Sequence, residues 1–134
     1  MKIYLYLIAI LIFTPCQNAL AGKTNVILHL NDKSKLPQLE KNVANLRKSI
    51  GDDLGIRVII NGKAITAMLS GNRLIEDKIN SMLANDAKIG LCHTSMRNNN
   101  IDKKHIIKGV TVLPDGALPT IINLQNEGYL YIKI

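Results

Sequence analysis

The sequence of 134 residues predicts an α/β fold in which helices cover both faces of a mainly parallel, five-stranded sheet. Segments of strand and helix character alternate along the chain, and no hairpin dipeptide joins two strands directly. The first strand has a continuous apolar centre, which is typical of a sheet covered on both faces. Right-handed crossovers through helices would make neighbouring strands parallel.

The strands are predicted from short runs of β-branched and aliphatic residues that end at polar or glycine-containing turns. The first run, Thr24 to Leu30, is broken by Asn31-Asp32-Lys33-Ser34. The other four are Ile56 to Ile60, Lys88 to Cys92, Val110 to Leu113 and Tyr129 to Ile132. In such folds, ligands bind beyond the carboxyl ends of the strands.

The helices are predicted from apolar residues that recur at intervals of three and four. The most regular pattern places Leu36, Leu39, Val43, Leu46 and Ile50 on one face, and Gly51 and Gly55 close this helix. A second helix is predicted from Arg73 to Ala84. Its inward-facing residues are expected to be Ile79, Met82, Leu83 and either Leu74 or Ile75. Shorter helical segments are predicted at Ala64 to Leu69, Thr94 to Asn98, Asp102 to Ile107 and Ala117 to Gln125.

Residues 1–21 have the features of a secretory signal peptide. Lys2 supplies the positive charge, Ile3 to Phe13 is an apolar run too short to cross a bilayer comfortably, and Ala19-Leu20-Ala21 fits a cleavage site. We therefore expect cleavage after residue 21, a single domain over residues 22–134, and a periplasmic or secreted protein with no membrane association. The alternative is an uncleaved N-terminal anchor.

Charge and composition limit the classes of partner. The formal net charge of +7 attracts phosphates or acidic proteins by long-range steering. However, Lys and Arg are scattered among Asp and Glu, and aromatic residues make up only 4% of the chain, too few for a base-stacking platform. The sequence therefore predicts no nucleic-acid binding.

Cleavage of the signal peptide would remove Cys16 and leave Cys92 as the only thiol. A single Cys excludes an intramolecular disulfide and a metal site built from a Cys cluster. Neither a Cys-His-Asp triad nor a G-x-G-x-x-G or Walker pattern is recognisable, so we predict no metal and no cofactor. Cys92 would then form a disulfide with another molecule, be a reactive site, or be buried and inert.

The candidate site is the stretch from Ala87 to Met96. Its apolar run brings Cys92 to the carboxyl end of a strand, immediately before a helical turn. If that turn begins at His93 or Thr94, its unpaired N–H groups and helix dipole favour the thiolate, and a protonated His93 would add to this effect. The alternative is a buried Cys92 that acts as a small hydrophobic residue.

Two further residues are candidates for ligand binding. His29 lies near the carboxyl end of its strand, where it either faces the same cleft as Cys92 or is a hydrogen-bonded structural histidine. Arg97 would supply a supporting positive charge to an anion held near Cys92. His105, on a short polar helix, is expected to be solvated.

A series of motifs extends over nearly all of the chain that follows the signal peptide. Its members are Val26 to Asn31, Asn42 to Leu46, Ile56 to Gly62, Ile89 to Arg97, Val112 to Gly116 and Leu124 to Ile132. The Cys92 segment and the ending Gln-x-Glu-Gly-Tyr-x-Tyr-Ile are the most specific of them. In this order the motifs resemble those of the DsrE/DsrF-like family of small sulfur-relay proteins, in its exported, single-domain branch.

The resemblance implies a flavodoxin-like or Rossmann-like three-layer α/β/α domain, often assembled into trimers or hexamers. In sulfur-relay members a Cys in the corresponding segment carries a persulfide, and by motif match that role falls on Cys92, with His93 and Thr94 beside it. We therefore expect a sulfur-relay protein of the cell envelope that passes sulfur to a partner thiol protein. The alternatives are a non-catalytic module that binds a small ligand and an oligomeric structural subunit with an inert Cys92.

Overall fold

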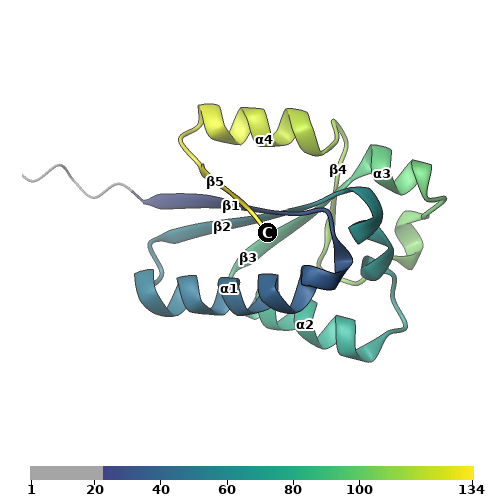
Figure 1. Ribbon diagram of the computed structural model, residues 1–134, viewed down its shortest axis with the longest axis horizontal. Helices are drawn as coiled ribbons and strands as arrows, with labels where there is room; N and C mark the ends of the chain where they lie inside the picture. The colour runs from purple at the N-terminus through teal and green to yellow at the C-terminus, as the bar shows by residue number, and fades with distance from the viewer. Residues whose placement is uncertain (1–22) are drawn as a thin grey trace, which may run out of the picture.

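The computed structural model describes residues 23–134, which form one sheet with helices on both of its faces (Figure 1). The predicted signal peptide lies outside the described residues. The strands are β1 (Thr24–Leu30), β2 (Leu54–Ile60), β3 (Ala87–Cys92), β4 (Thr111–Leu113) and β5 (Leu130–Lys133). Their order is β4-β3-β2-β1-β5, and every neighbouring pair is parallel. The predicted α/β class and five-stranded sheet are confirmed.

Helices connect each strand to the next and form two layers. Within the described residues these are α1 (Leu36–Ile50), α2 (Arg73–Ala84), α3 (His93–Asn98) and α4 (Ala117–Asn126), with 3-10 turns η1 (Lys33–Lys35), η2 (Gly62–Met68) and η3 (Lys103–His105). Figure 1 shows α4 on one face of the sheet and α1 and α2 on the other. No helix in residues 23–134 is both long and apolar enough to cross a membrane.

The strand order explains why α4 lies alone on its face. The steps from β1 to β2 and from β2 to β3 move in one direction across the sheet, so their right-handed crossovers place α1 and α2 on the same face. The step from β4 to β5 returns past β1 to the opposite edge, which places α4 on the other face. The three-layer arrangement predicted for the chain is thus confirmed.

The sheet divides the hydrophobic core into two layers, because successive residues of a strand point to opposite faces. The larger layer lies between the sheet and the helices α1 and α2 and includes Leu28, Leu39, Val58, Ile79 and Met82. The smaller layer lies beneath α4 and consists of Ile27, Ile59, Cys92, Ala117, Ile121 and Leu124. Cys92 is therefore packed in the layer that α4 covers.

Two residues were assigned wrongly in the predicted elements. Gly55, expected to close the first helix, lies inside β2, where the side chain of Asn25 occupies the space that a Cβ would need. Ile50, expected on the apolar face of α1, is 47% exposed because it is the last residue of the helix. Of the two alternatives predicted for α2, Ile75 is the inward-facing residue, since Leu74 is 76% exposed.

Candidate functional site

Cys92 lies where two helices begin. It is the last residue of β3 and the residue that precedes the first turn of α3. The first residue of α4, Ala117, donates a hydrogen bond from its backbone N–H to Cys92 Sγ, over 3.3 Å. The free N–H groups of a helix start favour an anion, so the sulfur lies in a setting that favours the thiolate.

The parallel sheet brings the start of α4 to the thiol. β4 is paired with β3 in a register that sets Leu113 beside Cys92, so the turn after β4 folds over the sulfur. Gly116 ends this turn with φ +85°, a conformation that side chains other than glycine rarely adopt. A Cβ at Gly116 would lie 3.6 Å from both Cys92 Sγ and Thr94 Oγ1. At that distance a Cβ makes ordinary contact, so the turn needs glycine for its backbone conformation, while a Cβ would cover part of the sulfur.

The pKa of the Cys92 thiol results from opposing effects. Burial raises the pKa and is the largest single effect. Hydrogen bonds from the Ser95 side chain and from the backbone N–H groups of Ser95, Ala117 and Thr94 lower it, and together they outweigh burial. The pKa is consequently lower than that of an ordinary cysteine, which increases the fraction of thiolate at neutral pH.

Ser95 is oriented for this role by a backbone group. The N–H of Gly62 donates a hydrogen bond of 2.9 Å to Ser95 Oγ, so the oxygen serves as an acceptor on that side. The hydroxyl proton is then free to point toward the sulfur. Ser95 thus connects the loop after β2 to the thiol.

The sulfur lies in the wall of a small pocket of about 220 Å³. The pocket is lined by Asn61, Cys92, Thr94, Ser95, Asp115, Gly116, Ala117, Leu118 and Pro119. We call it the thiol pocket. Only 6% of Cys92 is exposed, so a small atom such as a terminal sulfur reaches Sγ more readily than a bulky group.

His29 is buried close to the thiol pocket but does not line it. Its Nδ1 is 2.7 Å from the Tyr131 hydroxyl, and its Nε2 is 3.0 Å from Asn61 Oδ1. Because Asn61 Oδ1 is an acceptor, Nε2 carries the proton and Nδ1 accepts from Tyr131. Burial lowers the pKa of His29, with a smaller lowering from Lys133, while the Asn61 bond raises it. The neutral ring therefore holds Asn61, which does line the pocket.

Of the four residues predicted around Cys92, the structure brings only Thr94 into the thiol pocket. His93 and Arg97 are exposed and line a separate pocket with Met96 and Ile101. They are four positions apart on α3 and so share one face of the helix, and that face is turned away from the sulfur. The expected contact between an imidazolium at His93 and the thiolate is not formed.

Seven of the nine residues that line the thiol pocket were not predicted as site residues, and three of them have polar groups at or near the thiol: Asn61, Ser95 and Ala117. Ser95 is the second residue of the predicted helix and so lies in its first turn, and this position relative to the helix start was a usable signal. Asn61 and Ala117 follow β2 and β4, the strands on either side of β3. Only the strand order shows that they meet at Cys92. Within residues 23–134 no group of three or more His, Cys, Asp or Glu side chains is arranged to hold a metal ion.

The fold and this thiol define a small α/β protein with a cysteine of lowered pKa at the carboxyl edge of a parallel sheet. The sequence profile of the DsrE/DsrF-like family matches residues 27–134, and the chain belongs to this family. No curated protein sequence is significantly similar to the chain.

Several solved structures are similar to this one. A protein of unknown function from Methanobacterium thermoautotrophicum, MTH1491, superimposes with a TM-score of 0.74 and 20% identity, over 83% of this chain and 99% of its own. The ychN protein from E. coli gives 0.64 and 20%, over 84% and 99%. A conserved protein of unknown function from Bacteroides thetaiotaomicron, BT1422, gives 0.67 and 16%, over 87% and 100%. At these identities the similarity establishes the fold alone.

Proposed function

We propose that the protein is a persulfide carrier of the cell envelope in which Cys92 accepts a sulfur atom and passes it to the thiol of a partner protein. The observation that supports this most directly is the set of hydrogen-bond donors around Cys92 Sγ, supplied by the first turns of α3 and α4. They lower the pKa of the thiol. A lower pKa increases the fraction of thiolate that can attack a sulfur donor, and it makes the Cys92 thiolate a better leaving group when the sulfur is passed on.

The transfer consists of two exchange steps at sulfur. The Cys92 thiolate attacks the terminal sulfur of a donor persulfide, R–S–SH. A bond forms between Sγ and that sulfur, the S–S bond of the donor breaks, and the donor leaves as R–S⁻ with the bonding electron pair. In the second step an acceptor thiolate attacks the outer sulfur of Cys92–S–SH and releases Cys92 as its thiolate. Cys92 is oxidised as the donor is reduced, so no external oxidant is needed.

The pocket residues have distinct roles in this proposal. The N–H of Ala117 and the side chain of Ser95 stabilise the thiolate that is consumed in the first step and regenerated in the second. Asn61, held by His29, contributes an amide to the wall of the pocket in which the terminal sulfur would lie. We do not include His93 and Arg97, because they line a different pocket.

Mass spectrometry tests the proposal directly. The purified protein is exposed to polysulfide or thiosulfate, and we expect an adduct of about 32 Da, one sulfur atom, on Cys92. The adduct should be absent from Cys92→Ser and should be lost from the wild-type protein when a thiol acceptor is added. If the wild type forms no adduct while Cys92 is readily alkylated in the folded protein, the carrier function is wrong.

The main alternative is a Cys92 that is chemically inert. It is favoured by the low exposure of the residue, 6%, and by its place in the apolar layer under α4. The same experiment separates the two functions. A folded protein in which Cys92 resists alkylation as well as persulfidation would be a binding or structural module.

We further propose a homo-oligomer, a trimer or hexamer. This is supported by apolar side chains that α4 and β5 leave exposed, namely Leu118 (65%), Ile122 (58%), Leu130 (61%), Tyr131 (40%) and Ile132 (41%). Leu118 also lines the thiol pocket, so association through this face would narrow access to Cys92. Native mass measurement tests the assembly, and Ile122→Asp should reduce it to monomers.

The envelope location rests on the predicted signal peptide. We expect the protein in the periplasmic or secreted fraction, with its N-terminus at Gly22 or close to it. Cell fractionation followed by N-terminal sequencing tests this. Recovery from the cytoplasm with Met1 intact would contradict it.

A further inference from the structure

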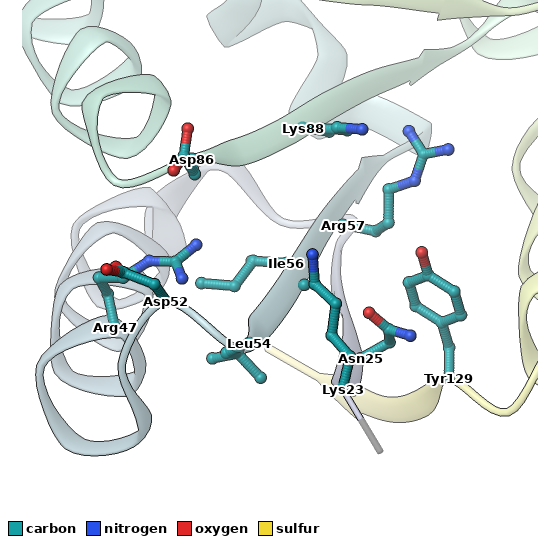
Figure 2. Close-up of a pocket in the computed structure, with 11 residues that line it drawn as sticks. Lys23, Asn25, Arg47, Asp52, Leu54, Ile56, Arg57, Asp86, Lys88 and Tyr129 are labelled. Carbon is teal, nitrogen blue, oxygen red and sulfur yellow. The ribbon is translucent and has the colours of Figure 1, made fainter. Parts of the chain in front are cut away.

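A second and larger pocket, of about 410 Å³, lies at the amino-terminal edge of the sheet (Figure 2). Residues from β1, β2 and β3, from the end of α1, and Tyr129 from the turn before β5 line it. Lys88 is the second residue of β3, whereas Cys92 ends it. At about 3.3 Å per residue the two are separated by about 13 Å along the strand, so this pocket is distinct from the thiol pocket.

The main feature of this pocket is a pair of adjacent cations. Arg57 on β2 is the register partner of Lys88 on β3, so their side chains leave the same face of the sheet next to each other. Within residues 23–134 neither forms a salt bridge. Like charges directly opposite each other destabilise a sheet.

Other donors surround this pair. Figure 2 shows the ends of the Arg57 and Lys88 side chains near each other at one end of the pocket, with the Tyr129 hydroxyl, Lys23 and Asn25 below them. Each of these groups can donate a hydrogen bond to an oxyanion. Asn25 fits beside β2 because Gly55 has no side chain.

The remaining charges lie at the opposite end. Figure 2 places Asp52 beside Arg47, with Asp86 on the same side of the pocket, away from Arg57. Arg47 is held in place by hydrogen bonds to the carbonyl oxygens of Asn85, at 3.1 Å, and Gly51, at 2.9 Å. Arg47 therefore forms the wall of the pocket, and the cations available to a ligand are Lys23, Arg57 and Lys88.

We propose that this pocket binds a small molecule carrying two or more oxyanion groups of the phosphate, sulfate or carboxylate kind. Arg57 supplies the planar fork that pairs with two oxygens of such a group, and Lys88 and Lys23 add point charges. The volume is within the range of sites for small ligands and exceeds what a single inorganic ion fills. The bound oxyanion would also relieve the repulsion between Arg57 and Lys88.

The proposal is tested by titrating the protein with pyrophosphate and recording the backbone amide chemical shifts by NMR at each step. We expect saturable binding with the largest shifts at Gly55, Arg57, Lys88 and Tyr129. The double variant Arg57→Gln/Lys88→Gln should bind at least about tenfold more weakly, because it loses two charge-assisted hydrogen-bonding groups. Inorganic sulfate and citrate, titrated in the same way, determine whether affinity follows the number of oxyanion groups or the presence of phosphorus.

The matched control is Lys41→Gln/Lys63→Gln, which removes the same net charge from two exposed positions outside the pocket. It should bind pyrophosphate as the wild type does. If either Gln substitution impairs folding, Arg57→Lys keeps the charge, removes the fork and should still weaken binding. The proposal is overturned if the wild type does not saturate, if both double variants lose affinity equally, or if the shifts centre on Cys92 and Ala117.

Discussion

The backbone N–H of Ala117 donates a hydrogen bond to Cys92 Sγ although the two residues are 25 positions apart in the chain. This contact joins the end of β3 to the start of α4 across the interval that contains α3 and β4. Because of this contact, N–H donors from the starts of two helices, α3 and α4, surround the thiol. The junction of β3 with α3 alone would supply donors from one helix start. The reactivity of Cys92 thus depends on the sheet order as well as on the local sequence.

The first prediction concerns the pH dependence of alkylation. Because the pKa of Cys92 is lowered from its ordinary value of 9.0, the rate of reaction with iodoacetamide should reach half its maximum at a lower pH than for a free cysteine. Ser95→Ala removes the side-chain donor and should raise that midpoint by roughly one pH unit, the equivalent of about 1.4 kcal/mol. Ser49→Ala, an exposed position on α1, serves as the control. An unchanged midpoint in Ser95→Ala would exclude this residue from the anion site.

The second prediction separates backbone strain from crowding of the thiol. Gly116 (φ +85°) and Gly51 (φ +90°) have similar backbones, but a Cβ meets Cys92 only at Gly116, and it meets nothing within 4 Å at Gly51. Both Ala variants should lose about 1–3 kcal/mol of unfolding free energy, measured by urea denaturation. Only Gly116→Ala should also slow alkylation of Cys92. Equal alkylation rates in the two variants would show that the turn does not limit access.

Most of the fold was predictable because continuous apolar runs mark the buried strands and apolar residues recur at helical spacing in α1 and α2. The run from Thr24 to Leu30 and the pattern from Arg73 to Ala84 match β1 and α2 at both ends. Gly55 was misassigned because glycine in a sequence indicates a turn, whereas here it leaves room for Asn25 from the neighbouring strand. Such a contact between strands has no local signature.

The candidate site was predictable only in part, for the same reason. Cys92 was identified from its place at a strand end before a helical turn, which is local information. The contributions of Ala117 and Asn61 require β3 to lie between β2 and β4, which no local pattern specifies. His93 lines a different pocket because adjacency in sequence does not place two side chains on one face of a helix.

The third prediction tests the core assignment with two leucines that differ in burial. Leu28, on β1, is 1% exposed, and Leu74, on α2, is 76% exposed. Leu28→Ala should reduce the unfolding free energy by about 2–5 kcal/mol, because it removes apolar contacts and leaves a cavity. Leu74→Ala should change it by less than about 0.5 kcal/mol. Urea denaturation of both variants measures the difference, and a comparable loss in Leu74→Ala would mean that α2 is covered by another surface in solution.

The last prediction follows from the buried His29. Its folded-state pKa is lowered from 6.5, chiefly by burial, so the unfolded chain takes up a proton at a higher pH than the folded one. The stability from the neutral ring is fully present above pH 6.5 and falls as the pH drops toward the folded-state pKa. Urea denaturation between pH 7 and pH 5 should therefore show a decline in the free energy of unfolding, and this decline should be smaller in His29→Gln, which does not titrate.

The hydrogen bond between His29 and Asn61 can be tested separately. Asn61→Ala removes the bond that raises the pKa of His29, so NMR titration of the ring protons should give a still lower pKa. An increase instead would mean that water, rather than Asn61, solvates Nε2, and that the ring does not hold Asn61 in the thiol pocket.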